Sequence, residues 1–221
     1  MDRIQESIEY TKGLIASMKN RGREYWLDNK NIESFYSLEE VCAINPKKPK
    51  LKENIEVSFI DMATLPIYGY KFSHSLIRPI AEVRKGYTYF EENDILIAKI
   101  TPCFENGKCG IATNLKNGIG FGPTEFIVLR PKKDILIEYI YIFISSKHFT
   151  DEGKNFMTGT AGQQRISIDF IKNYKIPIIS IEEQQKIIQE IEIEYNLLKE
   201  ICNLLKKQET KLNTMFKSLF T

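Results

Sequence analysis

The last forty residues carry the most regular hydrophobic pattern of the chain. Residues 181–220 contain no glycine or proline, and eight of eleven positions spaced three or four apart from residue 184 are apolar. This spacing predicts one continuous helix with an apolar side, about 60 Å long at 1.5 Å per residue. Ser180, followed by Glu182 and Glu183, provides a start signal. The candidate contact residues for a partner are Ile187, Ile191, Leu198, Ile201, Leu205, Leu212, Met215 and Leu219.

A shorter repeat of the same kind lies near the N-terminus and predicts a helix within residues 1–28. Its members are Ile4, Ile8, Thr11, Ile15 and Met18. The two helices could clamp the chain's own core, or they could pair and leave apolar surface for a second chain. We favour the second arrangement because the short helix covers only part of the long one. An antiparallel coiled coil is therefore expected.

Between these helices, residues 29–180 show short apolar segments of mixed type. The dipeptide Asn117-Gly118 between two such segments predicts a β-hairpin. We predict an α+β domain with a mainly antiparallel sheet, flanked by helices at residues 1–28 and 181–221. The expected strands are residues 57–62, 95–100 and 174–178, and the expected helices are residues 37–44, 135–145, 150–157 and 168–171.

Composition and charge narrow the classes of function. The 221 residues are 43% hydrophobic and 27% charged, which is typical of a folded protein. The net charge is +2, so any binding to nucleic acid must use a local cluster of positive charge. No signal peptide or membrane-length apolar run is present, and the four cysteines form no C-x-x-C pair. We expect a cytoplasmic protein with no membrane contact, metal site or cofactor.

Catalytic motifs are few. The sequence contains no phosphate-binding G-x-x-x-x-G-K-[ST], no G-x-G-x-x-G before a helix, and no G-x-S-x-G. It also lacks the Asn-Pro-Pro-aromatic string of adenine methyltransferases. Two acid-x-Lys triplets, Asp28-Asn29-Lys30 and Glu152-Gly153-Lys154, leave a metal-dependent nuclease open. We nominate no catalytic residue and expect a chain that is not an enzyme.

Three polar segments are candidates for ligand binding. Residues 47–52 contain four lysines, while residues 99–110 and 158–165 combine hydrogen-bond donors with glycine turns. Their occurrence on one domain favours a surface that binds nucleic acid. The candidate DNA-binding side chains of the two glycine-containing segments are Lys99, Thr101, Asn106, Lys108, Thr160, Gln163, Gln164 and Arg165.

Four ordered segments make the chain resemble a known family. They are DILIAKITPCFENGK, TEFIVLRP, TGTAGQQRI and IPIISIEEQ, which precede the long helix. This order resembles the specificity subunit of type I restriction-modification systems. The resemblance implies a target-recognition domain that reads half of a split DNA sequence. It also implies a methyltransferase subunit that modifies adenine and a motor-nuclease subunit that cuts DNA.

The resemblance has one large departure, because a full-length member has two recognition domains and two paired helices. This chain has one of each, so it resembles a half-subunit. We expect a homodimer that reads an interrupted palindrome, with the coiled coil setting the half-site spacing. Pairing with a different half-subunit, or an origin as half of a longer gene, remains open.

Residues that the whole family shares are poor candidates for discriminating sequences, because members read different sequences. Residues 67–85 are rich in Tyr, Ser, Lys and Arg and are the expected variable readers. The candidates there are Lys71, Ser73, His74 and Arg78. A coiled-coil assembly protein without DNA contact is the main alternative beside the nuclease.

Overall fold

A five-stranded sheet forms the centre of the globular head. The computed structural model describes residues 34–67, 69–73, 75–160 and 162–219. The central strand β7 is buried on both faces, since its side chains alternate between two hydrophobic clusters. All neighbours in this sheet are antiparallel except β4 and β8. The strand order is β2 (Cys42–Ile44), β10 (Phe126–Pro131), β7 (Ile95–Ala98), β8 (Cys109–Ala112) and β4 (Gly69–Phe72).

A four-stranded sheet covers one face of the central sheet. Its member Phe90 packs in the same cluster as Leu96 of β7. The ring of Phe90 lies over Gly120 of β9, where a Cβ atom would come within 2.0 Å of it. The outer face of this sheet is closed by the short helix α3 (Ile80–Val83). The strand order is β5 (Leu76–Pro79), β3 (Glu56–Phe59), β9 (Ile119–Gly122) and β6 (Thr88–Glu91).

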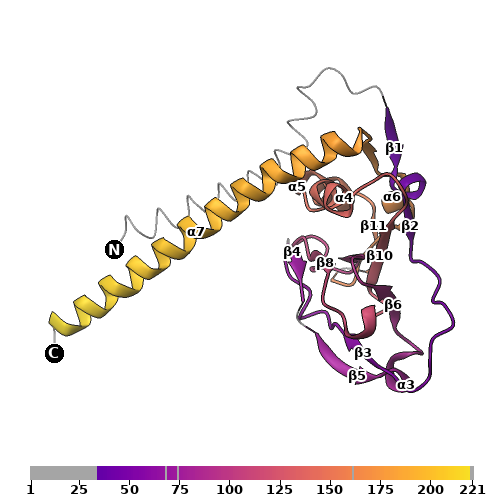
Figure 1. Ribbon diagram of the computed structural model, residues 1–221, viewed down its shortest axis with the longest axis horizontal. Helices are drawn as coiled ribbons and strands as arrows, with labels where there is room; N and C mark the ends of the chain where they lie inside the picture. The colour runs from indigo at the N-terminus through magenta and orange to yellow at the C-terminus, as the bar shows by residue number, and fades with distance from the viewer. Residues whose placement is uncertain (1–33, 68, 74, 161, 220–221) are drawn as a thin grey trace.

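Helices cover the other face of the central sheet (Figure 1). Ser146 and Ser167 cap two of them through their hydroxyl groups. Two short strand pairs complete the head: β1 (Phe35–Ser37) with β13 (Lys175–Pro177), and β11 (Met157–Thr158) with β12 (Arg165–Ile166). The helices are α2 (Leu38–Val41), α4 (Ile137–Ile144), α5 (Lys147–Lys154) and α6 (Ile168–Asn173).

The predicted α+β class with mainly antiparallel strands is confirmed, but the predicted hairpin is wrong. Strand β8 pairs in the five-stranded sheet, whereas β9 pairs in the four-stranded sheet. The connection passes through a 3-10 turn, η1 (Lys116–Gly118). Asn114, Asn117 and Gly118 all have positive φ there, and these left-handed residues carry the chain from one sheet to the other.

Two helix predictions also need correction. Residues 37–44 contain only one helical turn, α2, because the chain enters strand β2 at Cys42 and pairs with β10. The helix expected over residues 150–157 begins earlier, at Lys147, where the Ser146 cap fixes its start. Met157 belongs to strand β11.

The long C-terminal helix is α7 (Ile181–Leu219). It begins where the sequence predicted a start. The Ser180 hydroxyl accepts from the Glu183 N–H at 3.2 Å, and the Glu183 carboxylate accepts from the Ser180 N–H. The helix extends away from the head (Figure 1). None of the helices in the described ranges is long and apolar enough to cross a membrane.

The first turns of α7 are attached to the head. Gln184 is completely buried, and Ile187 is 8% exposed within the head's own hydrophobic core. Ile191 packs against the same core, and the Tyr70 hydroxyl of β4 donates a hydrogen bond to Glu192. Ile187, expected to contact a partner, is therefore covered by its own head. Residues 1–28, and the side chains of Leu198, Leu212, Met215 and Leu219, lie outside the described residues.

Candidate nucleic-acid interface

The two glycine-containing segments that sequence analysis selected lie against each other. The N–H of Ile166 donates to the carbonyl of Lys99, and the N–H of Thr101 donates to the carbonyl of Gln164, both at 2.9 Å. Ile100 and Arg165 form an antiparallel bridge between these bonds. This short ladder extends β7 and β12 past their ends. It brings the side chains of Lys99 and Arg165 to one carboxylate.

That carboxylate belongs to Glu125, which sequence reasoning missed. Its Oε1 atom accepts from Nη2 of Arg165 at 2.7 Å, and both of its oxygens lie 3.1 Å from Nε. Lys99 Nζ lies 3.7 Å from Oε2, and the Lys99 N–H donates to the Glu125 carbonyl. The bound Arg165 guanidinium lowers the pKa of Glu125, and Glu125 raises the pKa of Arg165. The sequence feature that could have pointed to Glu125 is its position in TEFIVLRP, one of the segments on which the family resemblance rests.

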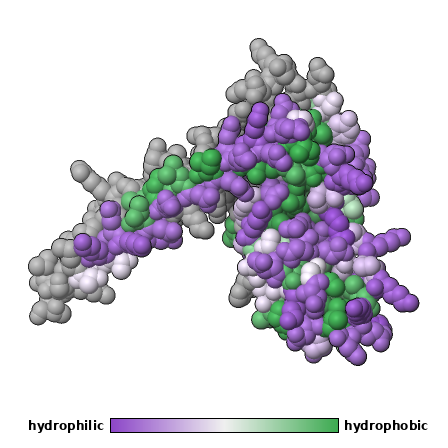
Figure 2. Space-filling model, in the orientation of Figure 1, coloured by the Kyte–Doolittle hydropathy of each residue, from purple (hydrophilic) through white to green (hydrophobic). Residues whose placement is uncertain are grey.

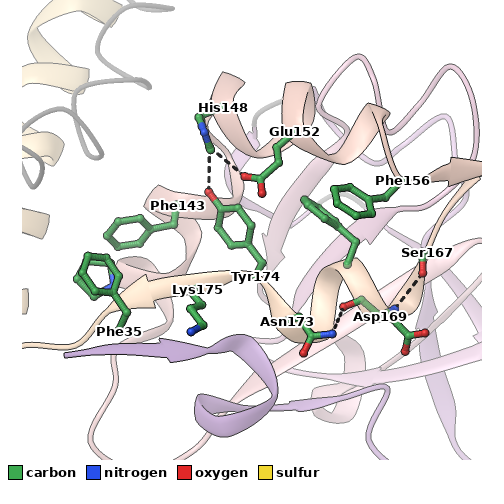
Figure 3. Close-up of a pocket in the computed structure, with 12 residues that line it drawn as sticks. Phe35, Phe143, His148, Glu152, Phe156, Ser167, Asp169, Asn173, Tyr174 and Lys175 are labelled. Carbon is green, nitrogen blue, oxygen red and sulfur yellow. Dashed lines mark hydrogen bonds and ion pairs between the residues drawn. The ribbon is translucent and has the colours of Figure 1, made fainter.

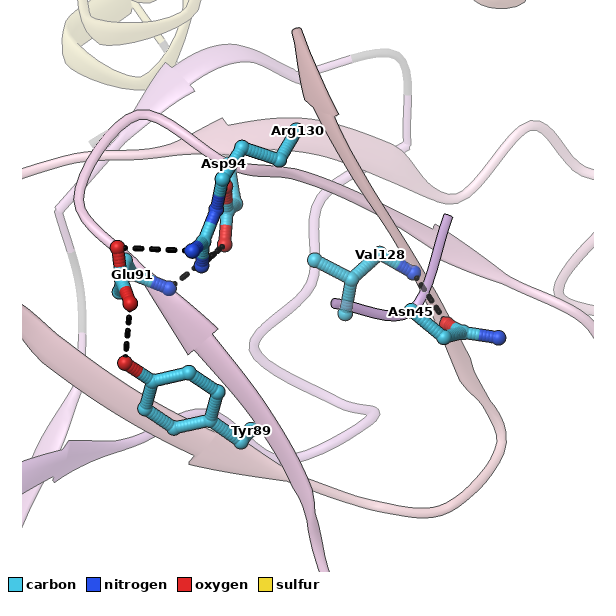
Figure 4. A network of polar contacts seen from close by, with 6 residues as sticks. All are labelled: Asn45, Tyr89, Glu91, Asp94, Val128 and Arg130. Carbon is cyan, nitrogen blue, oxygen red and sulfur yellow. Dashed lines mark hydrogen bonds and ion pairs between the residues drawn. The ribbon is translucent and has the colours of Figure 1, made fainter. Parts of the chain in front are cut away.

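A surface depression of about 490 Å³ adjoins this cluster. Lys48, from the lysine-rich segment, lies on its wall with Lys99 and Arg165. The side chain of Asn45 accepts a hydrogen bond from the Val128 N–H at 2.9 Å, which fixes the start of that segment (Figure 4). Other polar or aromatic residues of the depression are Tyr87, Thr88, Tyr89 and Thr124. Three cations, together with the exposed Tyr87 and Thr124, suit contacts to a phosphate backbone.

Arg78 lies near this depression, but Lys71 does not belong to it. The Arg78 guanidinium stacks 4.3 Å from the centre of the Phe59 ring, and Tyr87 packs on the same ring at 5.1 Å. Lys71, at the edge of the other sheet, forms an ion pair with Glu138 of α4 at 2.8 Å. Ser73 is exposed, and His74 lies outside the described residues. The structure therefore places Lys71 and Arg78 in different surroundings.

The remaining candidates divide into structural and exposed groups. Lys108 Nζ donates to the Met62 carbonyl at 2.7 Å and so anchors a loop of the head, while its contact with DNA stays a prediction. The Thr101 hydroxyl is buried, without a hydrogen-bond partner among the described residues. Gln164 is half-buried and serves the ladder through its carbonyl. Asn106, Thr160 and Gln163 are exposed.

Behind the interface, a charged network joins the two sheets (Figure 4). Arg130 of β10 binds the carboxylate of Asp94 through two bonds, at 2.8 and 2.7 Å. Its Nη1 atom lies 2.9 Å from Glu91 of β6, and Tyr89 donates its hydroxyl to the same carboxylate. Because Tyr89 also lines the depression, the network fixes the wall of the interface relative to the central sheet.

A second cavity, of about 550 Å³, lies on the helical side of the head (Figure 3). Nδ1 of His148 is 3.4 Å from the Tyr174 hydroxyl and 3.5 Å from Glu152. Glu152 opens one acid-x-Lys triplet, but Lys154 of that triplet binds Asp151 at 2.8 Å. The other triplet lies outside the described residues. Within the described ranges, no three His, Cys, Asp or Glu side chains are grouped to hold a metal ion.

Comparison with known proteins identifies a family and related sequences. Residues 29–214 match the family model of the type I restriction modification DNA specificity domain. The chain is 42% identical over 176 residues to the EcoAI specificity subunit of Escherichia coli and 38% identical over 173 residues to the EcoEI specificity subunit. Each alignment covers 78% of this chain, but only 29% and 28% of those relatives.

Two solved structures share the fold. One is a chain from a study of complex assembly and conformational transition in the type I R-M system, with a TM-score of 0.65 and 14% identity. The other is the HsdS subunit of Thermoanaerobacter tengcongensis, with a TM-score of 0.62 and 17% identity. The first superposition covers 97% of this chain and 53% of the solved chain. The second covers 99% of this chain and 50% of the solved chain. The chain belongs to the family of type I restriction-modification DNA specificity domains.

Proposed function

We propose that this chain is a DNA-reading subunit of a type I restriction-modification complex and that its depression contacts the DNA duplex. The observation that carries this proposal is the convergence of Lys48, Lys99 and Arg165 on one depression of the head. Cations placed this way neutralise phosphates and release counterions. Arg78, which stacks on Phe59, and the exposed Thr160 and Gln163 are the further residues that we propose touch bases or neighbouring phosphates.

The chain would act without catalysing a reaction. The curated relatives are named specificity subunits. We infer that methyl transfer to adenine and DNA cleavage belong to a methyltransferase subunit and a motor-nuclease subunit that assemble with it. Such a complex would work in the cytoplasm, where the DNA is.

Helix α7 supplies the support for a dimer. Beyond its attachment to the head, Ile193, Leu197 and Leu204 are each at least half exposed, and Ile201 is 37% exposed. Figure 2 shows hydrophobic side chains along one side of this part of the helix. These positions recur every three or four residues, which suits packing against another helix. We propose that two copies pair antiparallel here and hold two heads at a fixed spacing on an interrupted palindrome.

The alternative partner is a different half-subunit, or a second half encoded in the same gene. The chain spans only part of the length of its relatives, which is compatible with each of these arrangements. A symmetric dimer requires only one kind of head, so its two half-sites would have the same sequence. Sequencing of the methylated adenines in cells that express this chain and its methyltransferase distinguishes the two cases. A palindromic pair of half-sites supports the homodimer, and two different half-sites contradict it.

A gel-shift assay tests the function itself. The chain, with and without the methyltransferase subunit, is mixed with a random-sequence duplex in the presence and absence of magnesium. A shifted, uncut duplex is the expected result. No shift under any condition would favour the assembly protein without DNA contact. Magnesium-dependent cleavage by the isolated chain would favour the nuclease.

A further inference from the structure

We propose that Glu125 is a positioning residue that competes with DNA phosphate for Arg165 and Lys99 and weakens binding to any duplex. The inference rests on the DNA-binding function proposed above. Glu125 is the carboxylate that lies at the meeting point of the two segments, within 2.7 Å of Arg165 and 3.7 Å of Lys99. It holds both cations before DNA arrives.

The donor atoms involved are those that a phosphate would use. Glu125 binds the Nε and Nη2 edge of the guanidinium, and carboxylate and phosphate both accept two parallel N–H bonds from that edge. Nη1 donates to the Gln163 carbonyl at 3.1 Å. These bonds occupy three of the five N–H groups of arginine. A phosphate must therefore displace Glu125 from its edge or bind end-on to the N–H groups that remain.

The backbone of Glu125 is fixed beside the site. Its carbonyl accepts the Lys99 N–H, and the next residue, Phe126, begins strand β10 and is buried in the core. The carboxylate side chain is 24% exposed, so solvent screens it less than a free surface charge. It would remain beside the bound DNA as a fixed negative charge. The DNA would then meet the three positive charges of Lys48, Lys99 and Arg165 together with the one negative charge of Glu125.

The consequence is weaker binding to duplex DNA of any sequence. Affinity for any duplex comes mainly from phosphate contacts, and Glu125 weakens those contacts equally on every sequence. The base contacts of a correct half-site add to this reduced affinity, so the ratio of specific to non-specific binding is unchanged. Glu125 thereby lowers the salt-dependent part of the affinity without touching a base.

The test compares Glu125→Gln with a matched control, Glu53→Gln, in complexes with the methyltransferase subunit. Glu53 also pairs with an arginine, Arg84, at 3.4 Å, but it lies outside the depression. Both variants remove one negative charge. Anisotropy of a labelled random-sequence 30-base-pair duplex is measured across a salt series. Thermal melting is measured in parallel to confirm that both variants are folded.

We expect Glu125→Gln to bind the random duplex about three- to tenfold more tightly at low salt, with one to two additional counterions released. Glu53→Gln should change binding by less than about twofold. In an Arg165→Gln background the gain from Glu125→Gln should be mostly lost, because the released cation is gone.

Unchanged or weaker binding by Glu125→Gln, with an unchanged salt slope, overturns this inference alone and leaves Glu125 with a structural role. An equal gain in Glu53→Gln also overturns it, since net charge would then explain the effect. If the wild-type complex binds no duplex even at low salt, the proposed function fails, and this inference fails with it.

Discussion

The guanidinium of Arg130 binds both oxygens of the Asp94 carboxylate, which is 1% exposed. Asp94 precedes β7 and also accepts the Glu91 N–H at 2.7 Å, while Arg130 reaches Glu91 of the neighbouring sheet. Arg130, Asp94 and Glu91 thus form a polar connection between the two sheets. Loss of the Asp94 charge would weaken two hydrogen bonds made in the buried part of this network and leave Arg130 with Glu91 as its charged partner.

Substitution of Asp94 by Asn should therefore destabilise the head by about 3 kcal/mol. Urea denaturation followed by circular dichroism measures this change. Glu91→Gln, in the same network but with a more exposed carboxylate, should cost less than about 1 kcal/mol. Equal losses in the two variants would show that Asp94 is not the centre of the network.

Gln184 connects the long helix to the head. Its Oε1 accepts the Leu136 N–H at 2.8 Å, and its Nε2 donates to the Ile179 carbonyl at 2.9 Å. Gln184→Leu keeps the volume but leaves these buried groups unpaired, so we expect a loss of about 2 kcal/mol. Gln185→Leu is the matched control, because Gln185 is exposed on the same turn. Similar denaturation midpoints for both variants would contradict this role.

The exposed apolar residues of α7 should control self-association. Leu197→Glu combined with Leu204→Glu places charges on the exposed side of the helix, and we expect the dimer to dissociate. Sedimentation velocity at tens of micromolar measures the oligomeric state. Asn203→Glu, also on an exposed part of the helix, should leave the dimer intact. A wild-type chain that sediments as a monomer would contradict the proposed pairing.

The Glu125 ion pair predicts a dependence of stability on pH. Arg165 lowers the pKa of Glu125 below its value of about 4.5 in an unfolded chain. The stabilisation is therefore complete above about pH 4.5 and is lost as the pH falls through the lower, folded pKa. The difference in melting temperature between wild type and Glu125→Gln should shrink as the pH falls from 6 to 3. Arg165→Gln should flatten this profile, and a constant difference would contradict the assignment.

Substitutions of phosphate-binding residues and of base-reading residues should have different effects on DNA binding. Arg165→Ala should weaken binding to every duplex and reduce the salt dependence. Arg78→Ala should alter which sequence is methylated, as should Lys71→Ala if Lys71 leaves Glu138 when DNA binds. The measurements are anisotropy across a salt series and sequencing of modified adenines. If Arg165→Ala and Arg78→Ala both leave binding untouched, the interface lies elsewhere.

The parts of the fold that could be predicted were those with strong local signals. The strand at residues 95–100 was visible because both of its faces are apolar, and Ser180 with Glu183 marked the start of α7. Asn117-Gly118 led to the wrong prediction of a hairpin, because a turn sequence does not specify which strands pair. The left-handed residues Asn114 and Asn117 are as compatible with a crossing between sheets as with a hairpin.

In the candidate site, the sequence also identified individual residues but not their partners from distant parts of the chain. Lys99 and Arg165 were selected as donors, but their shared acid, Glu125, is distant from both along the chain. Lys108 was selected on its chemistry, yet its ammonium is bound by the Met62 carbonyl. Ile187 fits the helical spacing, but the head covers it. Such pairings depend on tertiary contacts that spacing cannot express.

The ladder between residues 99–101 and 164–166 has a consequence for protein engineering. Each segment satisfies the backbone of the other, through Thr101 with Gln164 and Ile166 with Lys99. A chimera that imports only one of the two from a relative would join mismatched halves of a single unit. Domain shuffling intended to change the target should therefore keep crossover points outside the whole stretch from β7 to α6, so that both halves come from the same parent.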